Sequence, residues 1–253
     1  MRLFLLIILP LLFSTQCAID KSEAQKQDHK KAFLEKTTVE VKDTFPVRSP
    51  SAERMPIDTT VLLTSIEVDY DTTQWTDVGQ LMPSIVLDIK YASTDNFVKT
   101  KMYECGRCFL RPLVAEKIIQ IHHELQAKGY GLKMFDCYRP RPVQQQLWDK
   151  LPDPRYVANP TKGSMHNRGG AVDLTIIDLK TGEDLDMGTP FDYFGEEAYH
   201  TYTKHSEEIA SNRKLLKGTM EAYGFRSIRT EWWHYSLGGT SYPLDDMVWK
   251  CDH

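Results

Sequence analysis

The sequence has no cluster of lysine and arginine, although 31 of its 253 residues are basic. Acidic residues number 35, the net charge is −4, and the basic stripe typical of nucleic-acid-binding proteins is missing. No apolar run reaches the roughly 20 residues that a membrane-spanning helix needs. Internal repeats are absent too, which argues against solenoids and propellers. Small solutes are therefore better candidate partners than nucleic acid.

Residues 1–16 have the pattern of a cleaved secretory signal, in which Arg2 precedes a short apolar run and small and polar residues follow. We therefore expect export to the periplasm. Cys17 leaves two alternatives open, lipid modification or ordinary signal cleavage near Ala18. Gln16 is not the small residue that usually precedes a lipidated cysteine. A lipid at Cys17 is the only membrane attachment that we expect.

Residues 17–65 are predicted to be a disordered tether. They are rich in Lys, Glu, Asp, Gln, Ser and Thr and show no sustained apolar period. Residues 66–253 then remain, enough for one domain with a substantial core and too few for two comfortable ones. The overall composition, 41% hydrophobic and 26% charged, is typical of a globular protein.

Strands and helices are expected to follow one another in this domain without regular alternation. Apolar and β-branched runs predict strands at 84–91, 131–138, 171–177 and 230–236. Apolar residues at helical spacing, with proline or glycine at the ends, predict helices from Pro112 to about 129, from about 143, and over 206–223. This order favours the α+β class, a single domain with a central, mainly antiparallel sheet flanked by helices.

Two adjacent histidines, His122 and His123, lie on the helix that follows Pro112. Neither has an acidic partner at the spacing of metal ligands. We therefore expect them on a solvated or partly packed face rather than in a metal site.

The stretch from Ser164 to Asp173 contains residue types that bind zinc. A catalytic zinc takes about three protein ligands and leaves one position open for water. His166, Asp173 and, some sixty residues later, His234 could be those ligands. The paired glycines Gly169 and Gly170 allow a tight turn after His166, because glycine reaches positive φ without steric penalty. Asp173 is expected near the start of a buried strand, where an unpaired carboxylate is costly, so it should be paired or bound to metal.

Glu231 lies three residues before His234, with two tryptophans between them that could exclude water. A carboxylate next to a metal site can act as general base and then as general acid. Arg139 follows another expected strand, and Pro140 and Pro142 should delay the next helix until about Val143. Arg139 is therefore expected on extended backbone at a cleft, where its N–H groups could stabilise a developing oxyanion.

Three motifs together resemble the D-alanyl-D-alanine dipeptidase family of zinc peptidases, which includes the vancomycin-resistance dipeptidases. They are Asp-Cys-Tyr-Arg-Pro at 136–140, Ser-x-His-x-x-Gly-x-Ala-x-Asp at 164–173 and Glu-Trp-Trp-His at 231–234. They occur in the family's order, and the likeness runs from about Met82 to about Tyr242.

The resemblance implies one zinc-peptidase domain that binds one zinc ion per chain and hydrolyses the D-alanyl-D-alanine dipeptide to two D-alanines. It implies His166, Asp173 and His234 as zinc ligands, Glu231 as catalytic base and acid, and Arg139 as the residue that stabilises the transition state. It also implies that Tyr91, Ser164 and Asp192 bind the substrate's amino end.

The cysteines after Cys17 form an even set, which favours disulfides in an oxidising compartment. Cys105 and Cys108 could instead be half of a zinc knuckle, but a second Cys-x-x-Cys is missing. The cysteine spacing does not fix the connectivity. The family resemblance favours pairing of Cys108 with Cys137, because it places their elements side by side.

Two other functions compete with a dipeptidase. One is a D,D-carboxypeptidase or endopeptidase of the same superfamily that acts on peptidoglycan stems. The other is a zinc-bearing binding domain without catalysis, against which the presence of Glu231 and Arg139 argues. The signal and the tether depart from the resistance enzymes, whose role requires cytoplasmic hydrolysis. Wall turnover or nutrient recovery therefore fits better than resistance.

Overall fold

A computed structural model describes residues 68–251. The predicted signal peptide (1–16), the tether (17–65) and Cys17 lie outside the described residues and stay predictions. The predicted domain, 66–253, contains every described residue. No helix in the described part of the chain is both long enough and apolar enough to span a bilayer.

The order of elements mixes short and long strands with three main helices. In chain order they are β1 (Thr76–Asp77), α2 (Val78–Leu81), β2 (Val86–Leu87), the 3-10 helix η1 (Lys90–Ala92), β3 (Phe109–Leu110), α3 (Pro112–Gln126), β4 (Tyr130–Asp136), α4 (Arg141–Lys150), η2 (His166–Arg168), β5 (Ala171–Asp178), η3 (Glu196–Ala198), α5 (Glu207–Ala222), β6 (Phe225–Ile228) and β7 (Glu231–Leu237).

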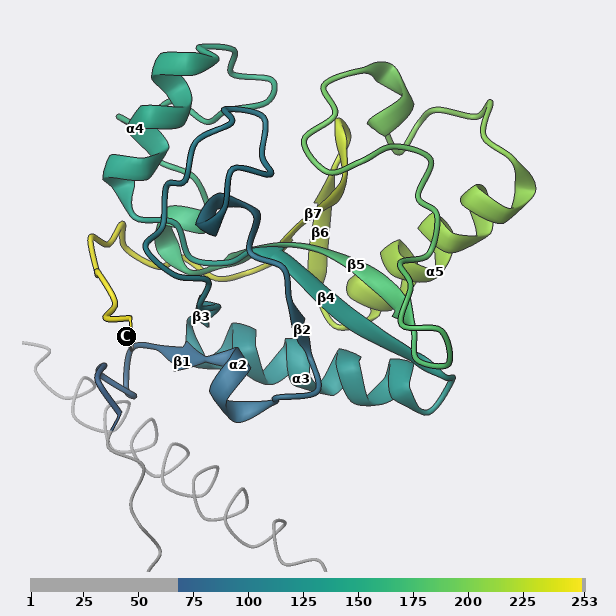
Figure 1. Cartoon of the computed structure of the whole chain (residues 1–253), viewed down its shortest axis with the longest axis horizontal. Coiled ribbons are helices and arrows are strands. Elements are labelled where there is room, and N and C mark those ends of the chain that lie inside the picture. The colour runs from purple at the N-terminus through teal and green to yellow at the C-terminus, as the bar shows by residue number, and fades with distance from the viewer. Residues whose placement is uncertain (1–67, 252–253) are drawn as a thin grey trace, which may run out of the picture. The chain divides into compact units, whose positions relative to one another are not determined.

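The main sheet has five strands in the order β2-β4-β5-β7-β6. Only the β2–β4 pair is parallel, and the other three pairs are antiparallel. Strands β1 and β3 form a small separate sheet. Figure 1 shows α3 along β4 below the sheet and α5 to the right of the sheet. Helix α4 and several loops lie above the sheet in this view. The predicted α+β class with a mainly antiparallel sheet flanked by helices is confirmed.

The two faces of the central strand β5 have different surroundings. Val172, Leu174 and Ile176 belong to the hydrophobic core. Asp173 and Thr175, which alternate with them, line cavities. Because successive side chains of a strand point to opposite faces, one face of the sheet forms the core and the other carries the candidate site.

Most predicted elements are confirmed within a few residues. The expected strand over 84–91 is largely wrong, because only Val86–Leu87 pair with β4 and the chain then turns into η1. Helix α4 begins at Arg141 rather than near Val143. Pro142 does not delay it, because the N–H groups of a helix's first turn have no partner within the helix anyway.

His122 differs from its expected solvated or partly packed position, since the side chain is fully buried. Its Nδ1 accepts a hydrogen bond from the Leu132 N–H at 3.2 Å, and its Nε2 lies 3.0 Å from the Ser84 hydroxyl. The apolar positions of α3 form a stripe wide enough to bury His122 against β4. Its neighbour His123 is exposed, as expected for a solvated face.

Candidate metal centre and active site

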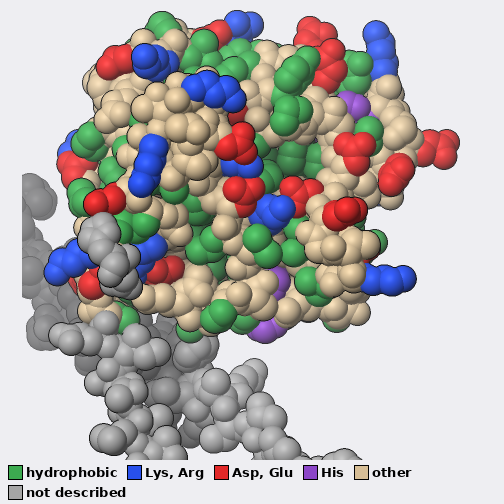
Figure 2. Space-filling view, viewed as in Figure 1, with side chains coloured by type: hydrophobic (Ala, Val, Ile, Leu, Met, Phe, Trp, Pro, Cys, Tyr) green, Lys and Arg blue, Asp and Glu red, His purple; other side chains and the backbone are tan. Residues whose placement is uncertain are grey.

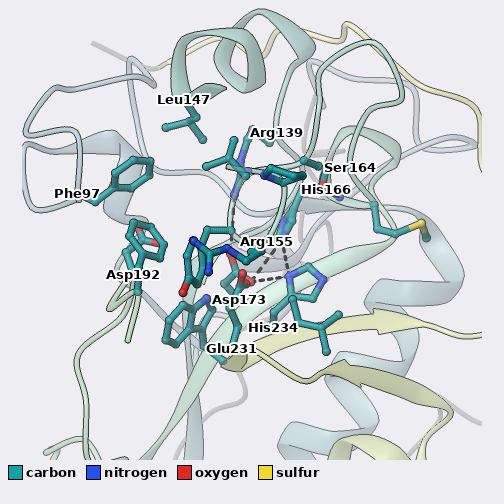
Figure 3. A pocket seen from close by; sticks show the side chains of 18 of the residues that line it. Phe97, Arg139, Leu147, Arg155, Ser164, His166, Asp173, Asp192, Glu231 and His234 are labelled. Carbon is teal, nitrogen blue, oxygen red and sulfur yellow. Dashed lines mark hydrogen bonds and ion pairs between the residues drawn. The ribbon is translucent and has the colours of Figure 1, made fainter. Parts of the chain in front are cut away.

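One cavity on the site face of the sheet contains every residue singled out as catalytic, metal-binding or substrate-binding (Figure 3). Its volume of about 280 Å³ is near the lower end of the roughly 300 to 1,000 Å³ of ligand pockets. The predicted residues that line it are Tyr91, Arg139, Ser164, His166, Asp173, Asp192, Glu231 and His234. The size suits a small substrate.

His166, Asp173 and His234 converge on one point, as the dashed lines in Figure 3 show. The pairing of β5 with β7 places Asp173 directly opposite His234, and η2 brings His166 to them. The Asp173 Oδ1 lies 3.0 Å from His234 Nδ1 and 3.3 Å from His166 Nε2, and the two nitrogens are 3.1 Å apart. Ligands about 2.0 to 2.1 Å from a tetrahedral zinc lie roughly 3.3 Å from one another, so the cluster fits zinc.

The ring of His166 is oriented by a hydrogen bond on the side away from the cluster. Its Nδ1 lies 2.7 Å from the Cys137 carbonyl oxygen, to which it can only donate. This fixes the tautomer and leaves Nε2 as an electron-pair donor, as is usual for histidines that bind metal. The main-chain N–H of Arg139 donates to the His166 carbonyl at 3.1 Å, which ties the two loops together.

The turn after His166 requires glycine. Gly169 has φ +67°, and a Cβ there would lie 2.4 Å from the ring of Trp75. A side chain would therefore be strained in its backbone and would also collide with a buried ring. The predicted reversal is confirmed at Gly169, which returns the chain from His166 to the start of β5, whereas Gly170 does not have a positive φ.

Asp173 is buried and remains ionised because of its neighbours. Burial alone would raise the pKa of its carboxyl, but the charges and hydrogen bonds of His166 and His234 outweigh burial and lower this pKa. A negative donor between two imidazoles attracts a cation. The cluster therefore has the donor types, spacing and charge of a three-ligand zinc site.

Arg139 lies deep in the cavity wall with its guanidinium fixed. Asp136 accepts hydrogen bonds from its Nε at 2.9 Å and its Nη2 at 2.7 Å, and Gln144 accepts from its Nη1 at 3.0 Å. The guanidinium also lies 5.1 Å from the centre of the Tyr91 ring. An arginine has five N–H donors, so those that remain are held in a constant orientation at the cavity.

Glu231, the first residue of β7, lines the same cavity and is mostly buried. Burial, followed by the negative charges of Asp173 and Asp192, raises the pKa of its carboxyl well above the usual range. A carboxyl with a raised pKa binds a proton more tightly than usual and can pass it on. This property suits alternating acid and base roles.

Asp192 and Tyr91 meet at another part of the cavity wall. The Tyr91 hydroxyl donates to Asp192 Oδ2 at 3.0 Å, and Asp192 has a positive φ of 58°, which aspartate tolerates better than most residues. Burial and the charge of Asp173 raise the pKa of Asp192 to about 8. Ser164 lies beside the metal cluster, where its hydroxyl accepts from the His166 N–H at 3.1 Å.

Three buried residues that organise the site had no role assigned from the sequence. Asp136 and Gln144 hold the Arg139 guanidinium, as described above. Asn167 is fully buried, donates to the Arg139 carbonyl at 2.6 Å and accepts from the Ser164 N–H at 2.7 Å. Asp136, three residues before Arg139 in the same motif, could have been inferred as an ion-pair partner, whereas nothing in the sequence indicates the role of Asn167.

The cysteines form two disulfides. Cys108 pairs with Cys137, which confirms the pairing favoured by the family resemblance, and Cys105 pairs with Cys251. The alternative of a zinc knuckle at Cys105 and Cys108 is excluded, because both sulfurs are in disulfides. Cys137, whose carbonyl orients His166, is thus tied covalently to Cys108.

Comparison with known proteins gives one consistent family. A family model described as peptidase M15, D-ala-D-ala dipeptidase, matches residues 71–250. The D-alanyl-D-alanine dipeptidase of Escherichia coli K12 is 37% identical over 182 residues, which cover 72% of this chain and 94% of that protein. The D-alanyl-D-alanine dipeptidase of Enterococcus faecalis V583 is 35% identical over 186 residues, 66% of this chain and 92% of that protein.

Among solved structures, a vancomycin-resistance D,D-pentapeptidase mutant in complex with Zn(II) aligns with a TM-score of 0.34 and 16% identity. The alignment covers 52% of this chain and 74% of that chain.

Proposed function

Since this chain belongs to the D-alanyl-D-alanine dipeptidase family of M15 zinc metallopeptidases, we propose that its cavity hydrolyses the D-alanyl-D-alanine dipeptide to two D-alanines. The observation that carries the proposal is the convergence of a His-Asp-His cluster, a protonatable carboxyl and a fixed guanidinium in one small cavity. Peptidoglycan turnover or recovery is the process that such an activity would serve.

One zinc ion per chain would be held by His166, Asp173 and His234. Zinc bound there would supply Lewis-acid chemistry, polarising the scissile carbonyl and increasing the acidity of water. The described residues contain one group of three clustered donors, which supports a single ion.

Asp192, Tyr91 and Ser164 would bind the amino end of the dipeptide. An ammonium group next to Asp192 favours the ionised carboxylate and so opposes the effect of burial on its pKa. The Tyr91 hydroxyl already donates to one oxygen of Asp192 and keeps the carboxylate in place. The amino group would thus be fixed on one side of the scissile bond.

Glu231 would take the proton of the attacking water and deliver it to the nitrogen of the departing D-alanine. Its raised pKa lets the carboxyl hold the proton between these two transfers. Arg139 would donate its remaining N–H groups to the oxygen on which negative charge develops. Because Asp136 and Gln144 already orient the guanidinium, this stabilisation needs little reorganisation.

The protein would act outside the cytoplasm, in the periplasm, with Cys17 as a candidate lipid anchor. Two disulfides in one small domain support an oxidising compartment, since stable disulfides are rare in the cytosol. The predicted signal at 1–16 points to the same compartment.

The substrate is tested with a panel of D-Ala-D-Ala, L-Ala-L-Ala and a peptidoglycan pentapeptide, each with and without chelator. We expect D-alanine release from the free dipeptide, no release of D-alanine from the pentapeptide, and loss of activity with chelator. Release of D-alanine from the pentapeptide at a comparable rate would instead show a carboxypeptidase. No turnover of any substrate by the zinc-loaded protein would contradict the proposal.

The metal ligands are tested by His166→Ala and His234→Ala. Each change leaves two donors, which hold zinc poorly, so bound zinc and activity should be lost together. Zinc is measured by atomic emission after gel filtration. His123→Ala, at an exposed histidine outside the cavity, is the matched control and should keep both. Full zinc occupancy in either ligand variant would contradict the assignment.

A further inference from the structure

In the proposed function, cavity residues bind the amino end, the reacting carbonyl and the departing nitrogen of a free dipeptide. None of these residues pairs with the dipeptide's carboxylate. A free dipeptide is a zwitterion, with an ammonium group at one end and a carboxylate at the other. Asp173, Asp192 and Glu231 line the cavity, and none of these carboxyl groups can supply a positive charge for that carboxylate. Asp136 and Gln144 hold the Arg139 guanidinium at the reacting carbonyl. A second cation is therefore needed for the carboxylate.

We propose that Arg155 binds the C-terminal carboxylate of the substrate, an inference that rests on the proposed function. Arg155 and Arg139 are the two arginines among the residues that line the cavity. Arg155 is labelled among these side chains in Figure 3, in the same view as Asp173 and Glu231. About 65% of the Arg155 side chain is exposed, so the guanidinium is accessible to an entering ligand.

One edge of the Arg155 guanidinium is occupied, and the other edge is open. Asp153 accepts from Nε at 3.0 Å and from Nη2 at 2.5 Å. In the described part of the chain, no residue accepts a hydrogen bond from Nη1. The edge formed by Nη1 and the second N–H of Nη2 can thus donate two parallel hydrogen bonds. This fork matches the two oxygens of a carboxylate, and Asp153 acts as a positioning residue for it.

The backbone of Arg155 is hydrogen-bonded to the residue that directly precedes β7. The Arg155 carbonyl oxygen accepts from the hydroxyl of Thr230 at 3.4 Å, and Thr230 directly precedes Glu231. The hydroxyl of Tyr156, the next residue, is hydrogen-bonded to that of Tyr199 at 3.1 Å. These contacts hold the backbone of the loop, whereas Asp153 orients the Arg155 side chain.

A carboxylate held by Arg155 would make the enzyme specific for substrates with a free carboxyl end. Converting that end to an amide removes its negative charge and one of its two acceptor oxygens. The amide would therefore bind less well, with an unchanged scissile bond and an unchanged amino end. This difference separates a carboxylate subsite from a role of Arg155 in folding or in the reaction itself.

The test compares D-Ala-D-Ala with its C-terminal amide on the zinc-loaded protein and on three variants. Arg155→Gln and Arg155→Lys alter the proposed subsite. Arg229→Gln is the matched control, because Arg229 is exposed and lies over the Tyr199 ring outside the cavity. Values of kcat and KM are measured for both substrates, together with the zinc content of each variant.

The unmodified protein should prefer the acid by about ten- to a hundred-fold in kcat/KM, the range expected for a charge-assisted hydrogen-bonded pair. Arg155→Gln should lose most of this factor on the acid, mainly through a higher KM, and should change the amide by less than about two-fold. Arg155→Lys should keep part of the preference, since it keeps the charge without the fork. Arg229→Gln should retain the full preference, and zinc should be constant throughout.

Arg155 is not the carboxylate partner if Arg155→Gln lowers acid and amide equally, or lowers neither. The same holds if the unmodified protein does not discriminate between the two substrates. A protein that turns over D-Ala-D-Ala but shows one of these results would contradict the role of Arg155 and leave the proposed function standing. Failure of the zinc-loaded protein to hydrolyse D-Ala-D-Ala at all would overturn both.

Discussion

The surroundings of the Glu231 carboxyl disfavour a negative charge. Glu231 is mostly buried and is flanked by the charges of Asp173 and Asp192. It is not one of the three clustered donors, which match in number the protein ligands of a catalytic zinc. Its function can therefore be separated from metal binding.

We expect Glu231→Gln to keep about one zinc per chain and to lower kcat by roughly two to four powers of ten. Glutamine preserves the shape of the side chain but cannot transfer the proton, and this range is what general acid-base catalysis usually contributes. Zinc content and steady-state kinetics measure the two effects. Loss of zinc would make Glu231 a ligand, and near-normal kcat would place the base elsewhere.

The placement of single residues shows why part of the site could be predicted from the sequence. The residue types and local spacing of His166 and Asp173, and of Glu231 and His234, already indicated zinc chemistry. Asn167 lies inside the same motif, yet its role depends on the carbonyl of Arg139, 28 residues away. Contacts that the fold creates between loops far apart in the sequence produce no local sequence pattern from which they could be predicted.

Helix α3 is attached to the sheet by a polar contact within an apolar interface. His122 receives the Leu132 N–H on Nδ1, so its Nε2 carries the proton and donates to Ser84. Burial, with a smaller effect of His123, lowers the pKa of His122 to about 4 from its usual 6.5. A proton on Nδ1 would break the bond to Leu132, so the helix packs correctly only with neutral His122.

The low pKa of His122 makes stability depend on pH in a defined direction. The folded state binds fewer protons than the unfolded state between pH 6.5 and 4, so the free energy of unfolding falls as pH decreases through this window. The full stabilisation is present above pH 6.5. One pKa unit corresponds to about 1.4 kcal/mol, which bounds the effect of His122 at roughly 3 kcal/mol.

Urea unfolding of the zinc-free protein at pH 7 and pH 4.5 checks this prediction. His122→Gln should be less stable at pH 7 and should lose less stability on acidification than the unmodified protein. His123→Gln, at the exposed neighbour on the same helix, should retain the original pH dependence. Equal pH dependence in all three proteins would contradict the role of His122.

Elements were predicted well where their own sequence pattern determines them. Strands β4 and β5 and helices α3 and α5 have long apolar patterns, and they lie where expected. The short strand β6 was not predicted, because four residues carry little periodicity and its pairing with β7 defines it. The strand expected over 84–91 shortened to β2 because tertiary contacts turn Tyr91 toward the cavity.

On the scale of the whole molecule, the segment after β7 connects the site to distant parts of the domain. The Asp245 N–H donates to the Asn167 carbonyl at 3.0 Å, and the Asp245 carboxylate pairs with Arg111 at 2.9 Å. Trp249 packs against Tyr103, with ring centres 5.1 Å apart. The Cys105–Cys251 disulfide then closes a loop with a sequence separation of 146.

Removing the Cys105–Cys251 disulfide should reduce stability more than activity. The double variant Cys105→Ser, Cys251→Ser should lower the free energy of unfolding by about 2 to 5 kcal/mol, since the bond restricts a long loop of the unfolded chain. At 25 °C its kcat should stay within about two-fold, because Asp245 and Trp249 keep the segment in place. Urea unfolding and kinetics measure these effects, and an unchanged urea midpoint would contradict the prediction.

Lys and Arg side chains are interspersed with acidic ones on the face of the molecule shown in Figure 2. This distribution matches the low net charge of the sequence.

The position of β7 in the chain has a consequence for biosynthesis. Strand β7 inserts between β5 and β6, and it carries Glu231 and His234. A nascent chain that has emerged from the ribosome only as far as β5 contains two of the three clustered donors, His166 and Asp173, and no Glu231. Because chains emerge with their N-terminal part first, hydrolytic competence arises only after β7 has been synthesised. A ribosome-bound intermediate is therefore harmless to D-alanyl-D-alanine in the compartment where the chain is made.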